Sequence, residues 1–213
     1  MKVLLAGATG LVGREILALL LADRGVAAVH TLGRRAPPTP HAKLHHHVSD
    51  LRSIPTLPPL DSAFIALGTT IKVAGSQEAF RAVDHDAVLA VARAARAAGA
   101  RRLGLVSAMG ADAGSRVFYN RVKGEVEQAV AQIGFETLVI ARPSLLVGDR
   151  GPLGQPERRG EVVGEAISRW LRPLIPANYR AIRAADVARA LVDALAQGQA
   201  GRRVLLSGAM QRG

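Results

Sequence analysis

The sequence predicts a doubly wound α/β protein of the Rossmann type, with a parallel sheet and a small C-terminal cap on the substrate side. Short apolar runs alternate with longer helical patterns along the chain, which is typical of a parallel sheet covered by helices on both faces. A glycine-rich segment, Gly7 to Gly13, joins the first apolar run to the first helical pattern, where such folds place a dinucleotide-binding turn. We expect one domain over residues 1–213, with 144–183 as the substrate-side segment.

The strands expected in the first half of the chain are short apolar runs that end near glycine or proline. They are Lys2–Ala6, Val26–Leu32, Lys43–Val48 and Ala63–Leu67. Runs of this length between turn residues are typical of buried strands. A helix is expected at Leu11–Arg24, because this segment has helical length and is followed by Gly25, a residue suited to a helix C-terminus.

The second half continues the alternation. A long helix is expected over Ser76–Ala98, since apolar residues recur there at spacings of three and four. The other elements expected are strands at Leu103–Val106, Thr137–Ala141 and Val204–Leu206, helices at Arg116–Ile133, Val162–Leu171 and Ala185–Gln197, and a loop at Gly148–Gly160. The helices after that loop are expected to form the cap.

The composition predicts a globular protein with an aliphatic core: apolar residues make up 49% of the chain, charged residues 21% and aromatic residues 3%. There is no cysteine, which excludes disulfides and a cysteine nucleophile and suits the cytoplasmic location that we expect. The apolar start of the chain stops at Gly7, too early for a signal peptide. No run reaches the roughly 18 apolar residues of a membrane span, so no membrane partner is expected.

The net charge of +11 comes from a strong excess of arginine. The basic residues are scattered along the chain, and no basic segment is interleaved with aromatic residues that could stack on bases. A nucleic-acid partner is therefore not expected. An anionic cofactor explains the charge better.

The segment from Gly7 to Gly13 has the glycine spacing of a dinucleotide-binding turn. Gly7 permits the tight turn out of the strand, Gly10 lets the backbone approach a pyrophosphate, and Gly13 allows close packing of helix on strand. The first helix then offers unpaired N–H groups and a partial positive charge to the phosphates. The cofactor-binding residues predicted here are Gly7, Ala8, Thr9, Gly10, Leu11, Val12 and Gly13. No Gly-Lys-Ser/Thr follows, which excludes a Walker A loop.

The end of the second predicted strand indicates which dinucleotide binds. Sites for NAD place an acidic residue there to hydrogen-bond the ribose 2′-hydroxyl. This chain instead has Arg34 and Arg35, and guanidinium groups suit a 2′-phosphate. We expect NADP(H) as the cofactor, with NAD(H) the weaker ligand.

Tyr119 and Lys123 form a Tyr-x-x-x-Lys pair on a predicted helix, and this spacing puts both side chains on one face. A nearby ammonium lowers the pKa of a tyrosine from about 10. Such a tyrosine can exchange a proton with a carbonyl/alcohol pair during hydride transfer. Ser107 follows the fifth strand, at the sheet edge where open α/β folds bind ligands. The predicted catalytic residues are therefore Ser107, Tyr119 and Lys123.

Three consecutive histidines, His45 to His47, do not predict a metal site. Successive residues of a strand point to opposite faces, so the three imidazoles do not converge. No nearby acidic or histidine spacing completes a ligand set. Asp186, near the start of a late helix, is expected to interact with the helix dipole.

Together these features resemble the short-chain dehydrogenase/reductase superfamily, and in particular its atypical members similar to the Tat-interacting-protein oxidoreductases. The resemblance runs from Met1 to about Leu195. It rests on the glycine turn, Ser107, Tyr119 and Lys123, and on the stretches Leu67–Thr70, Ala79–Asp84, Val106–Ala108, Phe118–Glu125 and Arg142–Ser144. It implies a Rossmann fold, NADP(H) and a Ser-Tyr-Lys site.

The resemblance also implies further cofactor contacts. Leu67, Gly68 and Thr69 would pass beneath the cofactor ribose, and Asp50 would approach the adenine. Lys123 would bind the nicotinamide ribose, with Pro143 and Ser144 beside the nicotinamide.

One position departs from the superfamily. Many of its enzymes have an asparagine on the long helix that completes a proton relay, and this chain has Asp84 there. Three functions therefore stay open: an NADP(H)-dependent oxidoreductase on a carbonyl/alcohol pair, an NADPH-binding regulatory or scaffold protein without turnover, and an epimerase or isomerase that keeps its cofactor. The substrate is not identified, and both a homodimer and a protein partner stay open.

Overall fold

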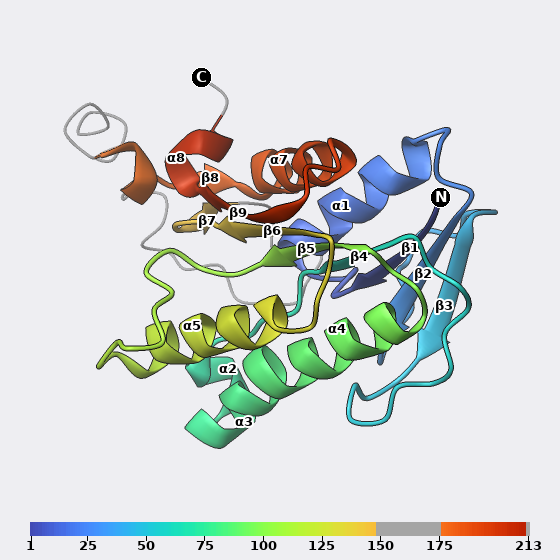
Figure 1. The fold of residues 1–213 in the computed structure, drawn as a ribbon. Coiled ribbons are helices and arrows are strands. Elements are labelled where there is room, and N and C mark those ends of the chain that lie inside the picture. Colours follow the sequence, from blue (N-terminus) through green and yellow to red (C-terminus); the bar gives the residue numbers. More distant parts are fainter. Residues whose placement is uncertain (148–175, 212–213) are drawn as a thin grey trace.

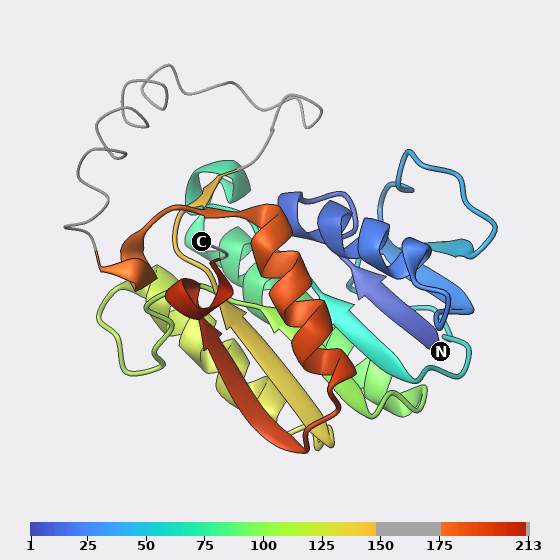
Figure 2. The ribbon, with the colours of Figure 1, turned by 90° about the horizontal axis from the view of Figure 1, so that it is seen from above.

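A computed structural model describes residues 1–147 and 176–211. In this part of the chain a sheet of seven parallel strands lies between two layers of helices (Figures 1 and 2). The strand order is β3-β2-β1-β4-β5-β6-β9. The bounds are β1 Lys2–Ala6, β2 Ala28–Gly33, β3 Leu44–Val48, β4 Ser62–Ile65, β5 Arg102–Val106, β6 Thr137–Arg142 and β9 Gly201–Leu206. The predicted doubly wound Rossmann fold is confirmed.

Two helices cover each face of the sheet. Figure 1 places α1 (Leu11–Ala22) and α7 (Ala184–Ala196) on one face, and α4 (Val88–Ala97) and α5 (Phe118–Ala131) on the other. The side chains of a strand alternate between the two resulting cores. On β1, for example, Val3 and Leu5 pack in the core beneath α1 and α7, whereas Leu4 and Ala6 pack against α4 and α5.

The long helix expected over Ser76–Ala98 is right in extent but not in regularity. The chain forms α3 (Gln77–Arg81), then a π-helical segment η1 (Ala82–Ala87), then α4. The Ser76 side chain accepts a hydrogen bond from the backbone N–H of Ala79 and so begins the helix. The wider π turn changes the direction of the side chains, and such turns occur mostly at functional sites. Here it carries Asp84, which is fully buried.

The segments after β6 are short. The strands β7 (Leu146–Val147) and β8 (Ile182–Arg183) pair with each other, a 3₁₀ turn η3 covers Ala177–Tyr179, and α8 covers Ser207–Met210. A further short helix, α2 (Ile71–Ala74), precedes α3. The loop expected at 148–160 and the helix expected at 162–171 lie outside the described residues.

The last strand begins earlier than the sequence predicts. It starts at Gly201 rather than Val204, because Arg202 and Arg203 belong to an exposed edge strand where polar side chains face solvent. No helix within 1–147 and 176–211 is long and apolar enough to cross a membrane.

Candidate functional site

The glycine turn is built on contacts that only glycine permits. Gly7 has φ +86°, in the left-handed region that favours glycine. A Cβ there would lie 2.4 Å from the carbonyl oxygen of Ala66, at the end of β4. A Cβ at Gly13 would lie 1.9 Å from the carbonyl oxygen of Gly7. These two glycines therefore allow α1 to pack directly on the strands.

The N-terminus of α1 fits a phosphate group. Gly10 precedes the helix and cannot cap it with a side chain, and the first turn contains no acidic residue. The first N–H groups of α1 thus lack a side-chain acceptor from the described residues, and such groups are a ready anion site. A Cβ at Gly10 would come no closer than 3.4 Å to protein atoms. Gly10 is therefore not required by packing, which agrees with a role in ligand approach.

The loop after β4 connects the glycine turn to the predicted catalytic helix. Ala66 contacts Gly7, as described above. Two residues on, Gly68 is exposed, and a Cβ there would lie 3.5 Å from Asp84 Oδ1 and 3.9 Å from Lys123 Nζ. The backbone N–H of Thr69 donates to Asp84 Oδ2 at 2.9 Å. The residues that the resemblance assigns to the cofactor ribose therefore lie against Lys123.

Lys123 and Asp84 form a buried ion pair. The Lys123 ammonium lies 2.7 Å from Asp84 Oδ1, and the side chains are 5% and 0% exposed. A buried lysine without an anionic partner would be strongly destabilising. Asp84 thus holds Lys123 from the side opposite to α5, at the position where the superfamily often has a neutral asparagine.

Tyr119 lies one helical turn before Lys123 on α5. Its ring packs against Phe80, with 5.4 Å between the ring centroids. Burial raises the pKa of Tyr119 above its usual value of 10.0, Lys123 opposes that rise, and Asp84 adds to it. The lowering of the pKa by Lys123 that the sequence predicts is present, but the effect of burial is larger.

Ser107 is buried just beyond the end of β5. Its backbone N–H donates to the Ala141 carbonyl at 2.8 Å, and its Oγ donates to Glu127 Oε1 at 2.6 Å. Glu127 also accepts hydrogen bonds from Arg142 and Arg202. The sequence analysis missed Glu127. Its signal was the spacing, because it follows Lys123 by four residues and shares its helix face.

Arg34 and Arg35 are exposed directly after β2, and neither forms an ion pair within the part of the chain that the structure describes. They are free to meet a ligand phosphate. Asp50 is also exposed, but its carboxylate accepts hydrogen bonds from the backbone N–H groups of Arg52 and Ser53. These bonds hold the pKa of Asp50 below its usual value. Asp50 therefore stabilises its own loop.

The last two predicted cofactor residues follow β6. The buried Pro143 accepts a hydrogen bond at its carbonyl from the Met109 backbone N–H at 2.9 Å. The Ser144 hydroxyl bonds the Arg180 carbonyl and lies 2.9 Å from Ser207 Oγ. Ser144 is therefore tied to the C-terminal segments.

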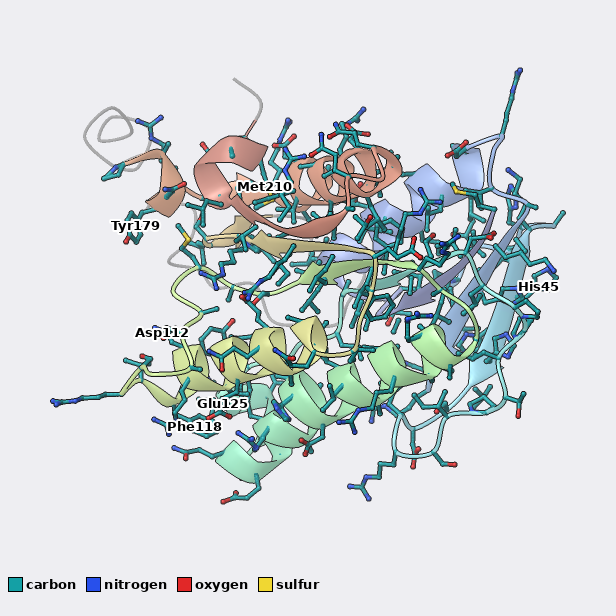
Figure 3. The ribbon with its side chains drawn as sticks, viewed as in Figure 1. His45, Asp112, Phe118, Glu125, Tyr179 and Met210 are labelled. Carbon is teal, nitrogen blue, oxygen red and sulfur yellow. The ribbon has the colours of Figure 1, made fainter. Side chains whose placement is uncertain are left out.

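The histidines lie away from this site. Figure 3 shows His45 on β3, at the far end of the sheet from Phe118 and Glu125 on α5. β3 is an edge strand of the sheet. His47 Nε2 lies 3.1 Å from His30 Nδ1, and His46 Nδ1 lies 3.0 Å from Thr31 Oγ1. No group suited to a metal ion occurs among the described residues.

Two curated proteins similar to this chain carry the name FMP52. Protein FMP52, mitochondrial, from Coccidioides immitis is 37% identical over 206 residues, covering 89% of this chain and 83% of that protein. Protein fmp52, mitochondrial, from Emericella nidulans is 44% identical over 159 residues, covering 70% of this chain and 68% of that protein. No protein-family model matches the chain.

Solved structures of short-chain dehydrogenases share the fold. An oxidoreductase of the short-chain dehydrogenase/reductase family from Burkholderia thailandensis gives a TM-score of 0.72 at 17% identity, covering 100% of this chain and 93% of that one. MoeE5 in complex with UDP-glucose and NAD gives 0.72 at 18% identity, covering 96% and 75%. The expected resemblance to this superfamily is confirmed in the fold.

One expectation is wrong. The absence of cysteine suggested a cytoplasmic location, but the similar curated proteins are named as mitochondrial. A chain without cysteine forms no disulfides in any compartment. The lack of cysteine therefore did not identify the compartment.

Proposed function

The chain belongs to the FMP52 family, and we propose that it is an NADP(H)-dependent oxidoreductase acting on a carbonyl/alcohol pair. One observation carries the proposal. The glycine turn packs closely against Ala66, and two residues further along the same loop Gly68 lies beside the Asp84–Lys123 ion pair, one helical turn from Tyr119. A phosphate-binding turn and a proton-donating hydroxyl thus belong to the same edge of the sheet.

The residues present fit a dinucleotide. Leu11, Val12 and Gly13 supply helix N–H groups for its pyrophosphate, and Gly68 leaves the Lys123 ammonium open to a ribose hydroxyl. When bound, the reduced nicotinamide would supply a hydride to a carbonyl carbon. Tyr119 would give its hydroxyl proton to the carbonyl oxygen, so that the products are an alcohol and a tyrosinate. The tyrosinate is stabilised by Lys123 until solvent returns a proton.

The preference for the phosphorylated cofactor is part of the proposal. Arg34 and Arg35 follow β2, at the place where NAD-specific sites carry an acid. Both guanidinium groups are exposed and lack ion pairs among the described residues. A 2′-phosphate would therefore bind them without breaking an existing contact.

The test is the Tyr119→Phe variant, assayed by NADPH oxidation with a panel of aldehydes, ketones and quinones. General acid catalysis by a side chain contributes about 10²–10⁴-fold in rate, so turnover should fall by at least about 10²-fold. NADPH affinity, measured by its fluorescence, should stay unchanged.

The chain offers a matched control. Tyr179 is the second of its two tyrosines and is 69% exposed. The Tyr179→Phe variant makes the same chemical change and should keep wild-type turnover. Equal activity of Tyr119→Phe and wild type would overturn the assignment of Tyr119.

The Asp84–Lys123 ion pair favours a second candidate function. It offsets part of the effect of the lysine charge on Tyr119, because Asp84 raises the pKa of that tyrosine. A protein that binds NADPH and reports it to a protein partner needs no such activation. This candidate predicts NADPH-dependent partner binding that survives the Tyr119→Phe change, with no turnover of any carbonyl compound.

A further inference from the structure

The hydroxyl group of Ser107 donates a hydrogen bond to Glu127. Ser107 Oγ lies 2.6 Å from Glu127 Oε1, and the Ser107 and Glu127 residues are 7% and 1% exposed. A carboxylate only accepts hydrogen bonds. The serine is therefore the donor in this contact.

Two arginines surround the carboxyl group of Glu127. Arg142 donates to both carboxylate oxygens, from Nε at 3.0 Å and from Nη2 at 2.6 Å, and Arg202 donates to Oε2 at 3.1 Å. The hydrogen bonds with Glu127 raise the pKa of Arg142, so that guanidinium stays charged. Four donors in total converge on this carboxylate. In this arrangement Glu127 holds the Ser107 hydroxyl in one orientation.

A serine hydroxyl has one proton and two lone pairs. Because the Ser107 O–H donates to Glu127, only the lone pairs of Ser107 Oγ are left for a ligand. A ligand carbonyl oxygen is also only an acceptor, so no hydrogen bond can form between it and these lone pairs. A ligand hydroxyl can donate to them.

We propose that Glu127 is a positioning residue that presents Ser107 to the ligand as a hydrogen-bond acceptor, so that the site binds the alcohol form of its substrate in preference to the carbonyl form. This deepens the proposed function and rests on it. Tyr119, protonated at neutral pH, supplies the complementary donor. One alcohol group can accept from Tyr119 and donate to Ser107, which satisfies both side chains.

The experiment uses two probes that cannot react. 1-Methylcyclohexanol is a tertiary alcohol without a hydride to give, and tetramethylene sulfoxide offers an acceptor only. The affinity of each for the full chain, saturated with NADP⁺, is measured by NMR titration. One buried hydrogen bond corresponds to about a tenfold difference in affinity, so wild type should prefer the tertiary alcohol by about tenfold.

Three variants separate positioning from general structure. In Glu127→Gln the amide oxygen should take the Oε2 position, which faces both arginines, so that the amide NH2 donates to Ser107 Oγ. The Ser107 proton is then released, so sulfoxide affinity should rise and the preference should fall towards one. In Ser107→Ala, which keeps Glu127 and its arginines, the preference should vanish without any gain in sulfoxide affinity. Glu125→Gln is the matched control, because Glu125 lies on the same helix and pairs with Arg81. It should keep the wild-type preference.

The outcomes are distinct from those of the proposed function, since the probes report binding without turnover. Equal binding of both probes to wild type, including no binding of either, overturns the proposal. A preference unchanged in Ser107→Ala also overturns it, even where Glu127→Gln fails to fold. If the wild type oxidises no NADPH with any carbonyl compound, the reductase assignment is contradicted, but the result of the probe titrations is unaffected.

Discussion

Lys123 Nζ lies 2.7 Å from Asp84 Oδ1, and this buried ion pair joins α5 to the π-helical segment η1. The same carboxylate bonds the Thr69 backbone through its second oxygen. One acidic side chain thus links three segments of the site. Its charge also reaches Tyr119, where it raises the pKa of the hydroxyl.

Replacing Asp84 by asparagine should lower both the stability of the protein and the pKa of Tyr119. Removing one partner of a buried ion pair costs about 3–5 kcal/mol, measurable by urea unfolding. The pKa falls because a negative charge that favours the protonated phenol is lost while Lys123 stays. Absorbance titration of tyrosinate in a Tyr179→Phe background reports Tyr119 alone. A pKa equal to that of the background protein would contradict the assigned coupling.

Two glycines of the first turn should separate folding from cofactor binding. Gly13→Ala forces a Cβ to within 1.9 Å of a backbone oxygen, so unfolding or a loss of about 3 kcal/mol or more is expected. Gly10→Ala finds its nearest protein atom at 3.4 Å and should keep the wild-type melting temperature. Its methyl group should nevertheless weaken NADPH binding. Unchanged affinity in Gly10→Ala would argue against a pyrophosphate at this helix end.

The double variant Arg34→Ala/Arg35→Ala should change cofactor choice without changing stability. Both residues are exposed, and surface substitutions of this kind stay within about 0.5 kcal/mol. Two lost charge-assisted bonds should weaken NADPH by at least about tenfold, while NADH affinity stays the same. The affinities for NADPH and NADH are measured in parallel titrations. An equal loss of affinity for both cofactors would show that the two arginines do not recognise the 2′-phosphate.

The histidines of β2 and β3 should make the protein sensitive to mild acid. Burial, followed by the neighbouring histidines, lowers the pKa of His30 and of His47 below 6.5. The folded state therefore favours their neutral forms. Stability is complete above pH 6.5 and falls as the pH drops through the lowered pKa values, because the unfolded chain takes up protons first.

Thermal unfolding of a His47→Gln variant checks this. Between about pH 6.5 and 5, its melting temperature should fall less than that of wild type, since His30 loses the neighbour that opposes its protonation. His41→Gln, at an exposed loop position, serves as the control and should follow the wild-type curve. Identical slopes for all three proteins would contradict the prediction.

The sequence was most informative where one pattern determines one structure. The predicted strands coincide with all seven strands of the main sheet. The prediction is clearest for the inner strands, because a strand buried between helix layers has few polar positions. The glycine turn was predictable for a similar reason. At Gly7 and Gly13 the neighbouring backbone lies too close for any side chain with a Cβ.

Contacts between distant side chains were not predictable in this way. Arg202 reaches Glu127 from the last strand, 75 positions away, and no local pattern encodes such a pairing. Ser107 was predicted as a catalytic residue, but the sequence did not show that its hydroxyl donates a hydrogen bond to Glu127. The π-helical turn at Ala82–Ala87 was missed because the apolar spacing over Ser76–Ala98 fits one continuous helix.

The two helix layers give ligand binding a further role. The glycine turn leads into α1 on one face of the sheet, whereas Tyr119 and Lys123 are carried by α5 on the other (Figure 1). A dinucleotide bound across the strand ends would contact both α1 and α5, and so would connect the two helix layers directly as well as through the sheet. Its binding energy would then make unfolding of the two layers a single event. Amide exchange in α1 and α5 would slow together, so cofactor supply would govern the lifetime of the folded chain as well as its chemistry.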